Sequence, residues 1–201
     1  IDIAITPNRG DCLGVRGVAR DLAAAGYGTL KPLDLSDEAG SFDSPLSWQI
    51  DKTAHAACPL ISGRMFEGVQ NGASPDWMAR RLDAVGQRPI SALVDITNYV
   101  MLELGQPLHA FDSAKISGNL RVARAGKFTE LVTLDKVKRK LAKDNLLITD
   151  DKKVLALAGT MGGLDSEVSE FTVAITLEAA HFDPMSIARN SRSQILGSEA
   201  S

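Results

Sequence analysis

The stretch NLLITDDKKVLALAG, residues 145–159, decides how the second half of the chain folds. Two short apolar runs flank the polar group Asp150, Asp151 and Lys152. Short apolar runs on either side of a polar tip are typical of a β-hairpin. We therefore predict a hairpin with these three residues at its tip. Three further stretches are predicted to be strands: residues 59–69, 119–125 and 172–182.

Two helices are predicted in the first half of the chain, each between a capping residue and a glycine. Asp11 is expected to cap the first helix, which Gly26 or Gly28 ends. Ser74 is expected to cap the second, with a proline in its first turn and Gly86 after its last. Both helices carry apolar residues at near-helical spacing, so each has one face to bury.

The remaining segments complete the prediction of the fold. A third helix is expected to begin at Asp183 and Pro184, while residues 89–105 are helical in length but rich in β-branched residues. Residues 29–45 form a Pro-, Gly- and Ser-rich connector. Helices early and strands late, without a βαβ rhythm, indicate an α+β fold with mixed or antiparallel sheets and peripheral helices. Two intimately packed sub-regions are expected, about residues 1–85 and 86–201.

Composition restricts the class of protein. The 201 residues carry a net charge of −3, which disfavours broad, non-specific binding of nucleic acids. No apolar run approaches the roughly 20 residues that span a bilayer, and no secretion signal opens the chain. Cys12 and Cys58 are too few for a disulfide framework, so a cytoplasmic setting is expected. The first residue, Ile1, and the abrupt end predict a piece of a longer protein.

Common catalytic and metal-binding patterns are missing from the sequence. The three histidines, His55, His109 and His181, are scattered and form no ligand motif with a cysteine. His55 and His181 are interpreted as structural or surface residues. No serine stands in a nucleophile elbow. The glycine-rich stretch at 157–167 lacks the lysine of a phosphate loop, so it is either a tight turn or a place where backbone amides face a ligand.

Two residues leave alternatives open. Glu178 closes an apolar strand, where a lone carboxylate is costly unless a partner meets it, although strand alternation could equally place it in solvent. His109, in the stretch ELGQPLHAFD, is either a satisfied structural residue or part of a site. From residue types and spacing alone, the prediction stops at an α+β domain with an unusual glycine turn and a candidate pocket.

Three stretches together resemble one family. ITPNRGDCLGVRGVARDLAA (5–24), ISALVDITNYVMLELGQPLHAFD (90–112) and LALAGTMGGLDSEV with LEAAHFDPMSIARNSR (155–192) are similar to the bacterial phenylalanyl-tRNA synthetase β chain, in its central editing region. The resemblance implies post-transfer editing, which is the hydrolysis of tyrosyl-tRNA(Phe). It also implies that this piece does not itself charge tRNA.

Matched position by position, the resemblance implies a pocket between two parts of the domain. His109, Asn98 and Thr97 would act on the ester, and Glu178 would accept a hydrogen bond from the phenolic hydroxyl of tyrosine. We expect His109 to position the attacking water and the terminal ribose, with proton transfer as the alternative. The remaining residues of the implied substrate pocket are Arg88, Gly162, Gly163, Ser198 and Ala200.

The sequence departs from the family at a few positions. Gly197 and Ser198 stand where members more often carry His or Asn followed by Thr or Ser, and Lys136 replaces a common glycine. The departure at Gly197 and Ser198 puts the assignment of Ser198 and Ala200 in doubt.

Partners and cofactors follow from the same resemblance. The implied partners are the acceptor end of tRNA(Phe) and the synthetase α chain in an α2β2 parent enzyme, with no membrane. No metal or cofactor is expected in this piece, whereas the parent uses ATP and Mg²⁺. The rival hypothesis is a structural region that binds tRNA or the α chain without editing, and a third is a free-standing editing protein.

Overall fold

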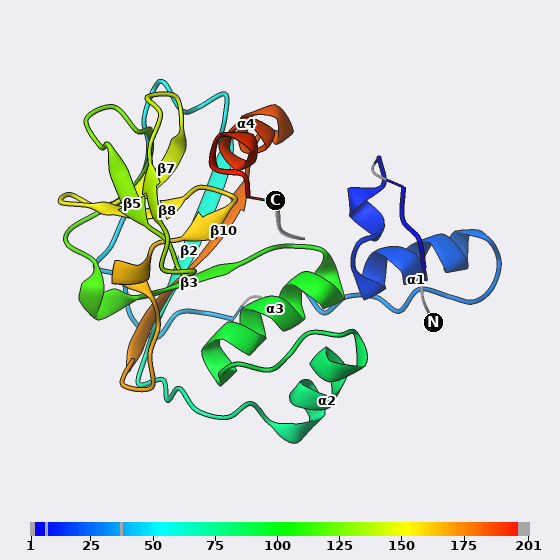
Figure 1. Ribbon diagram of the computed structural model, residues 1–201. Helices are drawn as coiled ribbons and strands as arrows, with labels where there is room; N and C mark the ends of the chain where they lie inside the picture. The colour runs from blue at the N-terminus through cyan, green and yellow to red at the C-terminus, as the bar shows by residue number, and fades with distance from the viewer. Residues whose placement is uncertain (1–2, 7, 37, 197–201) are drawn as a thin grey trace.

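The computed structural model describes residues 3–6, 8–36 and 38–196, and it confirms the predicted α+β class (Figure 1). The largest sheet has the strand order β1-β4-β7-β8-β9. Its β1–β4 pair is parallel and its other pairs are antiparallel. These strands are β1 (Trp48–Ile50), β4 (Leu120–Arg124), β7 (Leu146–Thr149), β8 (Val154–Leu157) and β9 (Met161–Gly162).

The predicted hairpin is confirmed as β7 and β8. Leu147 pairs with Leu157 and Ile148 with Ala156, and the register then shifts after Ile148. Every residue of both strands is buried because apolar clusters lie against this sheet, one of them containing Ile148 and the other Leu147. Burial of both strands explains why the sequence shows continuous apolar runs instead of alternation.

A three-stranded antiparallel sheet faces the larger one. Its central strand is β10 (Ala174–His181), flanked by β2 (Leu60–Glu67) and β3 (His109–Asp112). Phe111 of β3, Ile148 of β7 and Ile187 of α4 belong to one buried core cluster, so the two sheets and this helix pack across it. A separate two-stranded ribbon is formed by β5 (Glu130–Val132) and β6 (Lys138–Lys140).

The helices lie at the periphery, as predicted. They are α1 (Val15–Ala24), α2 (Asp76–Ala84), α3 (Ala92–Leu104) and α4 (Pro184–Gln194). In Figure 1, α2 and α3 lie below the sheets, α4 covers their upper end, and α1 lies to one side beyond α3. None of the helices within the described residues has the length and apolar character needed to cross a bilayer.

Two of the three predicted caps are wrong. Helix α1 begins after Gly14, while Asp11 lies in a preceding 3-10 turn and forms ion pairs with arginines. Ser74 donates its hydroxyl to Asp95 of α3 instead of capping α2. The cap at Asp183 is confirmed, since its carboxylate accepts a 2.7 Å hydrogen bond from the Ser186 amide.

Most of the ambiguous segment 89–105 is helical, as α3 (Ala92–Leu104), and the connector 29–45 has no regular element among its described residues. Both larger sheets take strands from either side of residue 85, since β1 pairs with β4 and β2 with β10. The predicted boundary near residue 85 therefore does not separate the sheets, and the two sub-regions remain a prediction.

Candidate functional site

The candidate site is built around a carboxyl group and an imidazole on adjacent strands. Glu178 of β10 lies directly opposite His109 of β3 in the antiparallel register. Glu178 is 6% exposed, and its carboxyl group has no hydrogen bond or ion pair with another residue in the described part of the chain. Burial raises the pKa of Glu178 to about 8 and lowers the pKa of His109 to about 4. Both groups are therefore mainly neutral at pH 7.

The neighbours of this pair explain its burial. On the other side of β10, Glu178 lies opposite Gly63, and a side chain at Gly63 would collide with the indole of Trp48. The His109 ring packs edge-on against Phe111, with 4.5 Å between ring centroids. Burial raises the pKa of Cys58 to about 11, with a further contribution from Glu178, which is ionised in that pH range. This thiol therefore stays protonated at neutral pH and is a poor nucleophile.

Gly162 brings the backbone of β9 against the imidazole. A Cβ at Gly162 would lie 2.5 Å from Cε1 and 2.7 Å from Nε2 of His109, distances that no real Cβ tolerates. The adjacent Gly163 has a different role. Its amide donates to the Leu155 carbonyl at 2.7 Å, so that amide is already used inside the sheet.

These groups border one cavity of about 860 Å³ between the two sheets and α4. His109, Gly162 and Glu178 line its interior. Its apolar wall includes Leu134, Ile148, Leu157, Phe182 and Ile187.

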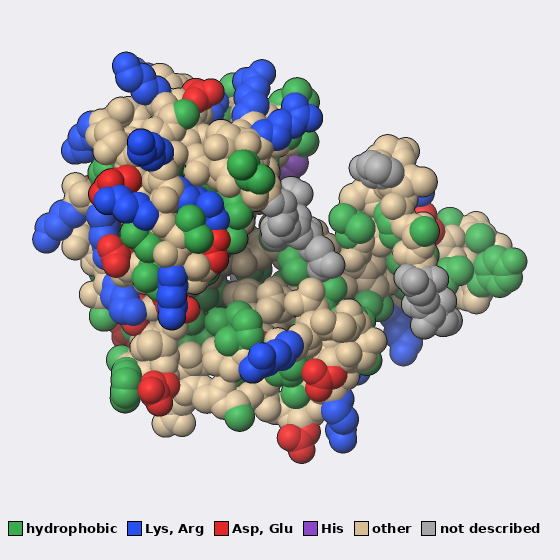
Figure 2. Space-filling model, viewed as in Figure 1, with side chains coloured by type: hydrophobic (Ala, Val, Ile, Leu, Met, Phe, Trp, Pro, Cys, Tyr) green, Lys and Arg blue, Asp and Glu red, His purple; other side chains and the backbone are tan. Residues whose placement is uncertain are grey.

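The mouth of the cavity is polar and positively charged. His181 at the end of β10 and Arg192 of α4 border the cavity and are exposed. The hydroxyl of the neighbouring Ser191 is buried and has no hydrogen-bond partner among the described residues. Figure 2 shows Lys and Arg side chains gathered over α4 with a histidine beside them. The cavity thus has a neutral, desolvated interior and a cationic opening.

The structure does not bring every predicted residue to this cavity. Thr97 is buried in α3, and its hydroxyl donates to the Val94 carbonyl at 2.7 Å. Asn98 is half-buried in the same helix, and Arg88 is exposed between α2 and α3. None of these three is among the described residues that line the cavity, and neither is Gly163. Ser198 and Ala200, with Gly197, lie outside the described residues.

Sequence reasoning missed the residues of the mouth. His181 was expected to be a structural or surface residue, and Ser191 and Arg192 carried no motif. His181 reaches the cavity at the end of β10, whereas Ser191 and Arg192 reach it because α4 is fastened to the large sheet by a buried asparagine. Asn190 is 1% exposed and bonds the backbone of Leu146 in both directions, at 2.9 Å each.

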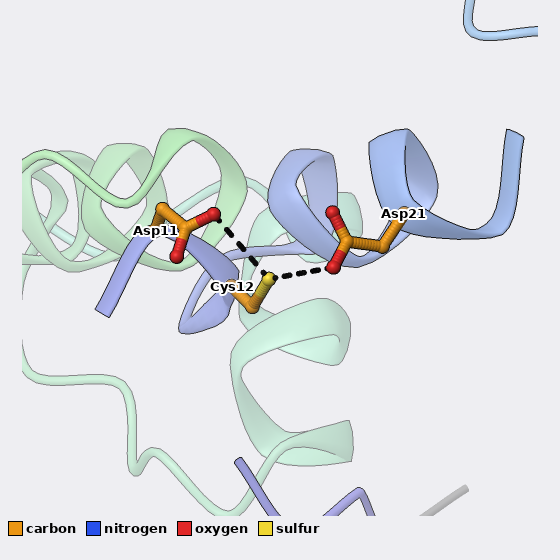
Figure 3. Close-up of side chains that lie close together, drawn as sticks. All are labelled: Asp11, Cys12 and Asp21. Atoms are coloured by element: carbon orange, nitrogen blue, oxygen red, sulfur yellow. Dashed lines mark hydrogen bonds between the residues drawn. The ribbon is translucent and has the colours of Figure 1, made fainter. Parts of the chain in front are cut away.

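A second group of ionisable residues lies far from the cavity, around the start of α1 (Figure 3). One oxygen each from Asp11 and Asp21 and the sulfur of Cys12 lie within 4.8 Å of one another, as in a metal site. However, Arg9 and Arg20 both pair with these two carboxylates. The guanidinium groups hold the pKa of Asp11 and of Asp21 below its usual range.

The thiol in this group is a poor metal ligand. Burial and the hydrogen bond to Asp21 raise the pKa of Cys12. A thiol must lose its proton to bind a metal, and two positive charges already satisfy the carboxylates. The arrangement is an ion-pair network that fastens the 3-10 turn to α1.

Comparison with known proteins supports the resemblance seen in the sequence. Residues 57–201 match the B3/4 domain family. The whole chain is 50% identical to part of the phenylalanine–tRNA ligase beta subunit of Gluconobacter oxydans and 50% identical to part of that of Cereibacter sphaeroides. It covers 24% and 25% of these two proteins, so the chain spans about a quarter of the length of these curated relatives.

A solved structure shows the same fold at much lower identity. It is the crystal structure of an N-terminal fragment of the phenylalanyl-tRNA synthetase beta subunit from Pyrococcus horikoshii, with a TM-score of 0.52 and 16% identity. The match covers 93% of this chain and 58% of the other. The predicted resemblance to the phenylalanyl-tRNA synthetase β chain is confirmed, and this chain belongs to the B3/4 domain family.

Proposed function

We propose that this chain is the editing region of a phenylalanyl-tRNA synthetase β chain and hydrolyses tyrosyl-tRNA(Phe). The observation that carries the proposal is the Glu178 carboxyl group. This residue is 6% exposed, and it lies opposite His109 and lines the cavity without a hydrogen bond or ion pair to another described residue. An unmet buried polar group is costly, and a ligand with a matching polar group removes that cost.

The phenolic hydroxyl of tyrosine is such a group. Tyrosine is larger than phenylalanine, so a pocket that accepts tyrosine cannot reject phenylalanine by size. With a pKa of about 8, the Glu178 carboxyl is mostly protonated at neutral pH, so it can both donate to and accept from a phenol. Bound phenylalanine would leave this group unmet, at a cost of roughly 1–3 kcal/mol, or about 5- to 150-fold in discrimination.

His109 is suited to positioning water next to the ester. Its depressed pKa keeps the imidazole neutral, so one ring nitrogen accepts a hydrogen bond and the other donates one. The contact with Gly162 restricts where the ring can lie. Holding water in a reactive geometry lowers the entropic part of the barrier to ester hydrolysis, and proton transfer to His109 is the alternative role.

The cavity supports only part of the predicted site. It supports His109, Gly162 and Glu178, whereas the roles of Arg88, Thr97, Asn98, Gly163, Ser198 and Ala200 rest on the family resemblance. The α chain as partner, ATP and Mg²⁺ in the parent, and a cytoplasmic location belong to the same proposal.

A purely structural role is the second candidate, favoured by one observation. The N-terminal part exposes large apolar side chains, with Tyr27 at 82%, Leu13 at 59% and Val15 at 57%. Exposed apolar groups in one region are typical of a surface that packs against another part of a protein. This role and editing are compatible, but a structural role alone leaves the buried carboxyl without a use.

The test compares release of tyrosine from tyrosyl-tRNA(Phe) with release of phenylalanine from phenylalanyl-tRNA(Phe) by the complete synthetase. Wild type is expected to release tyrosine selectively, Glu178→Ala to lose about 5- to 150-fold of that selectivity, and Glu178→Gln to keep part of it. Glu67→Gln is the matched control, because Glu67 is an exposed carboxylate in the same sheet. Absence of selective release in wild type would leave the structural role as the function.

A further inference from the structure

Positive charge is concentrated in one part of the chain. Between residues 121 and 153 there are ten Lys and Arg against five Asp and Glu, whereas the whole chain has a net charge of −3. The rest of the chain therefore carries a net charge of −8. Figure 2 shows many of the Lys and Arg side chains on the lobe formed by β5, β7 and β8, and further ones over α4.

Several of these cations are already neutralised. Arg121 lies 3.5 Å from Asp51, and Lys138 lies 2.8 Å from Glu130. Arg139 pairs with a carboxylate four residues before it. Several cations close to α4 form no ion pair within the described residues. Four of them we call the basic track: Arg124, Lys140, Lys143 and Arg192.

Hydrogen bonds hold the segments of the basic track together. Gln194 of α4 donates to the Lys140 carbonyl at 2.9 Å, and Arg124 donates to the Asp144 carbonyl at 2.7 Å. The Asn145 side chain donates to Asn190 of α4 at 3.1 Å. The last turns of α4 and the loop after β6 therefore form one surface. Asp144 is the only carboxylate between Lys140 and Asn145.

The basic track ends at the cavity. Arg192 belongs both to the track and to the mouth of the cavity, beside the unpartnered hydroxyl of Ser191. The cavity volume of about 860 Å³ lies near the upper end of the roughly 300–1,000 Å³ typical of sites for drug-sized ligands. Such a volume has room for an amino acid together with the nucleoside that carries it.

We propose that the basic track binds the phosphates of the single-stranded 3′ end of an aminoacylated RNA and leads its terminal nucleoside into the cavity. The inference rests on the proposed function. Arg192 binds the phosphate closest to the cavity, because it is the one member at the mouth, while the other three bind phosphates further from the ester. Positively charged grooves that follow a backbone are the usual means of binding single strands.

The first experiment measures hydrolysis of tyrosyl-tRNA(Phe) by the complete synthetase at several salt concentrations. Arg192→Gln and the double variant Lys140→Gln, Lys143→Gln are expected to raise the substrate concentration that gives half-maximal rate. Each lost phosphate contact should lower the slope of log affinity against log salt by about 0.7. Arg80→Gln is the control, since Arg80 is an exposed cation on α2, away from the track, and it should leave the slope unchanged.

The second substrate is tyrosyl-adenosine, which carries the ester and the nucleoside but no phosphate. The double variant Lys140→Gln, Lys143→Gln should hydrolyse it as wild type does, because these two residues are not among the described residues that line the cavity and would contact only phosphates. Two results would contradict phosphate binding by the basic track. One is that the double variant hydrolyses both substrates more slowly by the same factor, and the other is that the salt dependence of its affinity for tRNA equals that of wild type.

A binding experiment with a short RNA that has a single-stranded 3′ end and carries no amino acid separates this inference from the proposed function. If wild type releases no tyrosine, editing fails as the function. Phosphate binding by the basic track is nevertheless supported if the variants bind this RNA more weakly and with the predicted salt slope. It is contradicted if the variants bind the RNA as wild type does.

Discussion

Around the start of α1, two carboxylates and a thiol lie among two guanidinium groups at the surface, whereas in the cavity one carboxyl faces one imidazole with no counter-ion among the described residues. Both places shift pKa values, but for opposite reasons. Ion pairing lowers the pKa of Asp11, while burial raises the pKa of Glu178 to about 8. The first group is complete without a ligand, and the second becomes complete only when a polar ligand meets it.

A cluster of ionisable residues can be either a structural ion-pair network or a binding site. By residue type the N-terminal group looks more like a site, since it contains acids and a cysteine within 4.8 Å of one another. Its donors and acceptors already satisfy one another, so it has a structural role. The cavity pair looks sparse, yet its unmet groups give it binding energy to offer a substrate.

The largest effect is expected at Gly162, where the cavity pair depends on close contact. Gly162→Ala puts a methyl group against the His109 ring and must displace it, since the added Cβ would lie 2.5 Å from Cε1. A displacement of about 1 Å can reduce a rate by roughly 100-fold. We expect such a loss in tyrosine release, measured as kcat with the complete synthetase.

The control for this substitution is Gly72→Ala, because a Cβ at Gly72 meets no atom within 4 Å. Activity within a few-fold of wild type in Gly162→Ala would show that the position of His109 does not control the rate.

The next effect concerns how the folding stability of the protein changes with pH because of Glu178 and His109. The folded state holds a proton on Glu178 up to a pKa of about 8, while the unfolded state loses it near 4.5, so stability should fall as pH rises between these values. His109 acts oppositely, because its pKa falls from 6.5 to about 4 on folding, so stability should rise between pH 4 and 6.5. From about pH 4.5 to 6.5 the opposite effects of Glu178 and His109 on the free energy of unfolding cancel. Above pH 6.5 only the loss of stability due to Glu178 remains.

Wild type should therefore lose on the order of 2 kcal/mol of stability between pH 6.5 and 8. Glu178→Gln should abolish that loss and reveal the rise due to His109 at lower pH. Urea unfolding at half-unit pH steps measures both, with Glu67→Gln as the control. A Glu178→Gln curve parallel to that of wild type would contradict the buried, neutral carboxyl.

A smaller effect is expected in the N-terminal group. Arg9→Gln removes one cation from exposed carboxylates, and exposed ion pairs contribute little to stability. We expect a slight drop in Tm at low salt that vanishes in 1 M NaCl, where the Debye length is about 3 Å. A large loss that persists in high salt would show that the network supports more of the fold than its exposure indicates.

No effect is expected from adding a metal ion to the group formed by Asp11, Cys12 and Asp21. Addition of Zn²⁺ should leave Tm unchanged in wild type and equally in Cys12→Ser, because the carboxylates are neutralised by arginines and the thiol keeps its proton. A rise in Tm that Cys12→Ser removes would turn this structural group into a metal site.

The parts of the fold that the sequence predicted well are local. The β7–β8 hairpin and the Asp183 cap depend on residues within a few positions of one another. Ser74 failed as a cap because its hydroxyl bonds Asp95, 21 positions along the chain. Strands β1, β5, β6 and β9 have two or three residues each, and their stability comes from neighbours that no local pattern reveals.

The same limit applies to the site. Residue types and spacing left Glu178 and His109 as open alternatives, and only the pairing of β10 with β3 places them opposite each other. The wall formed by Ser191 and Arg192 depends on how Asn190 anchors α4. Such contacts arise from tertiary packing, which overrides local preference.

The order of strands in the three-stranded sheet has a consequence for how the protein is made. Strand β2 leaves the ribosome before its partner β10, which begins at Ala174, more than a hundred residues after β2 ends at Glu67. At about 5–20 residues per second, translation leaves β2 without β10 for roughly 5 to 20 seconds. During that time Phe66 and the rest of this strand lack the central partner they have in the finished sheet, and such long-range pairing is slow. Glu178 and His109 meet only when β10 joins the sheet, so the proposed hydrolytic activity requires that β10 has been synthesised.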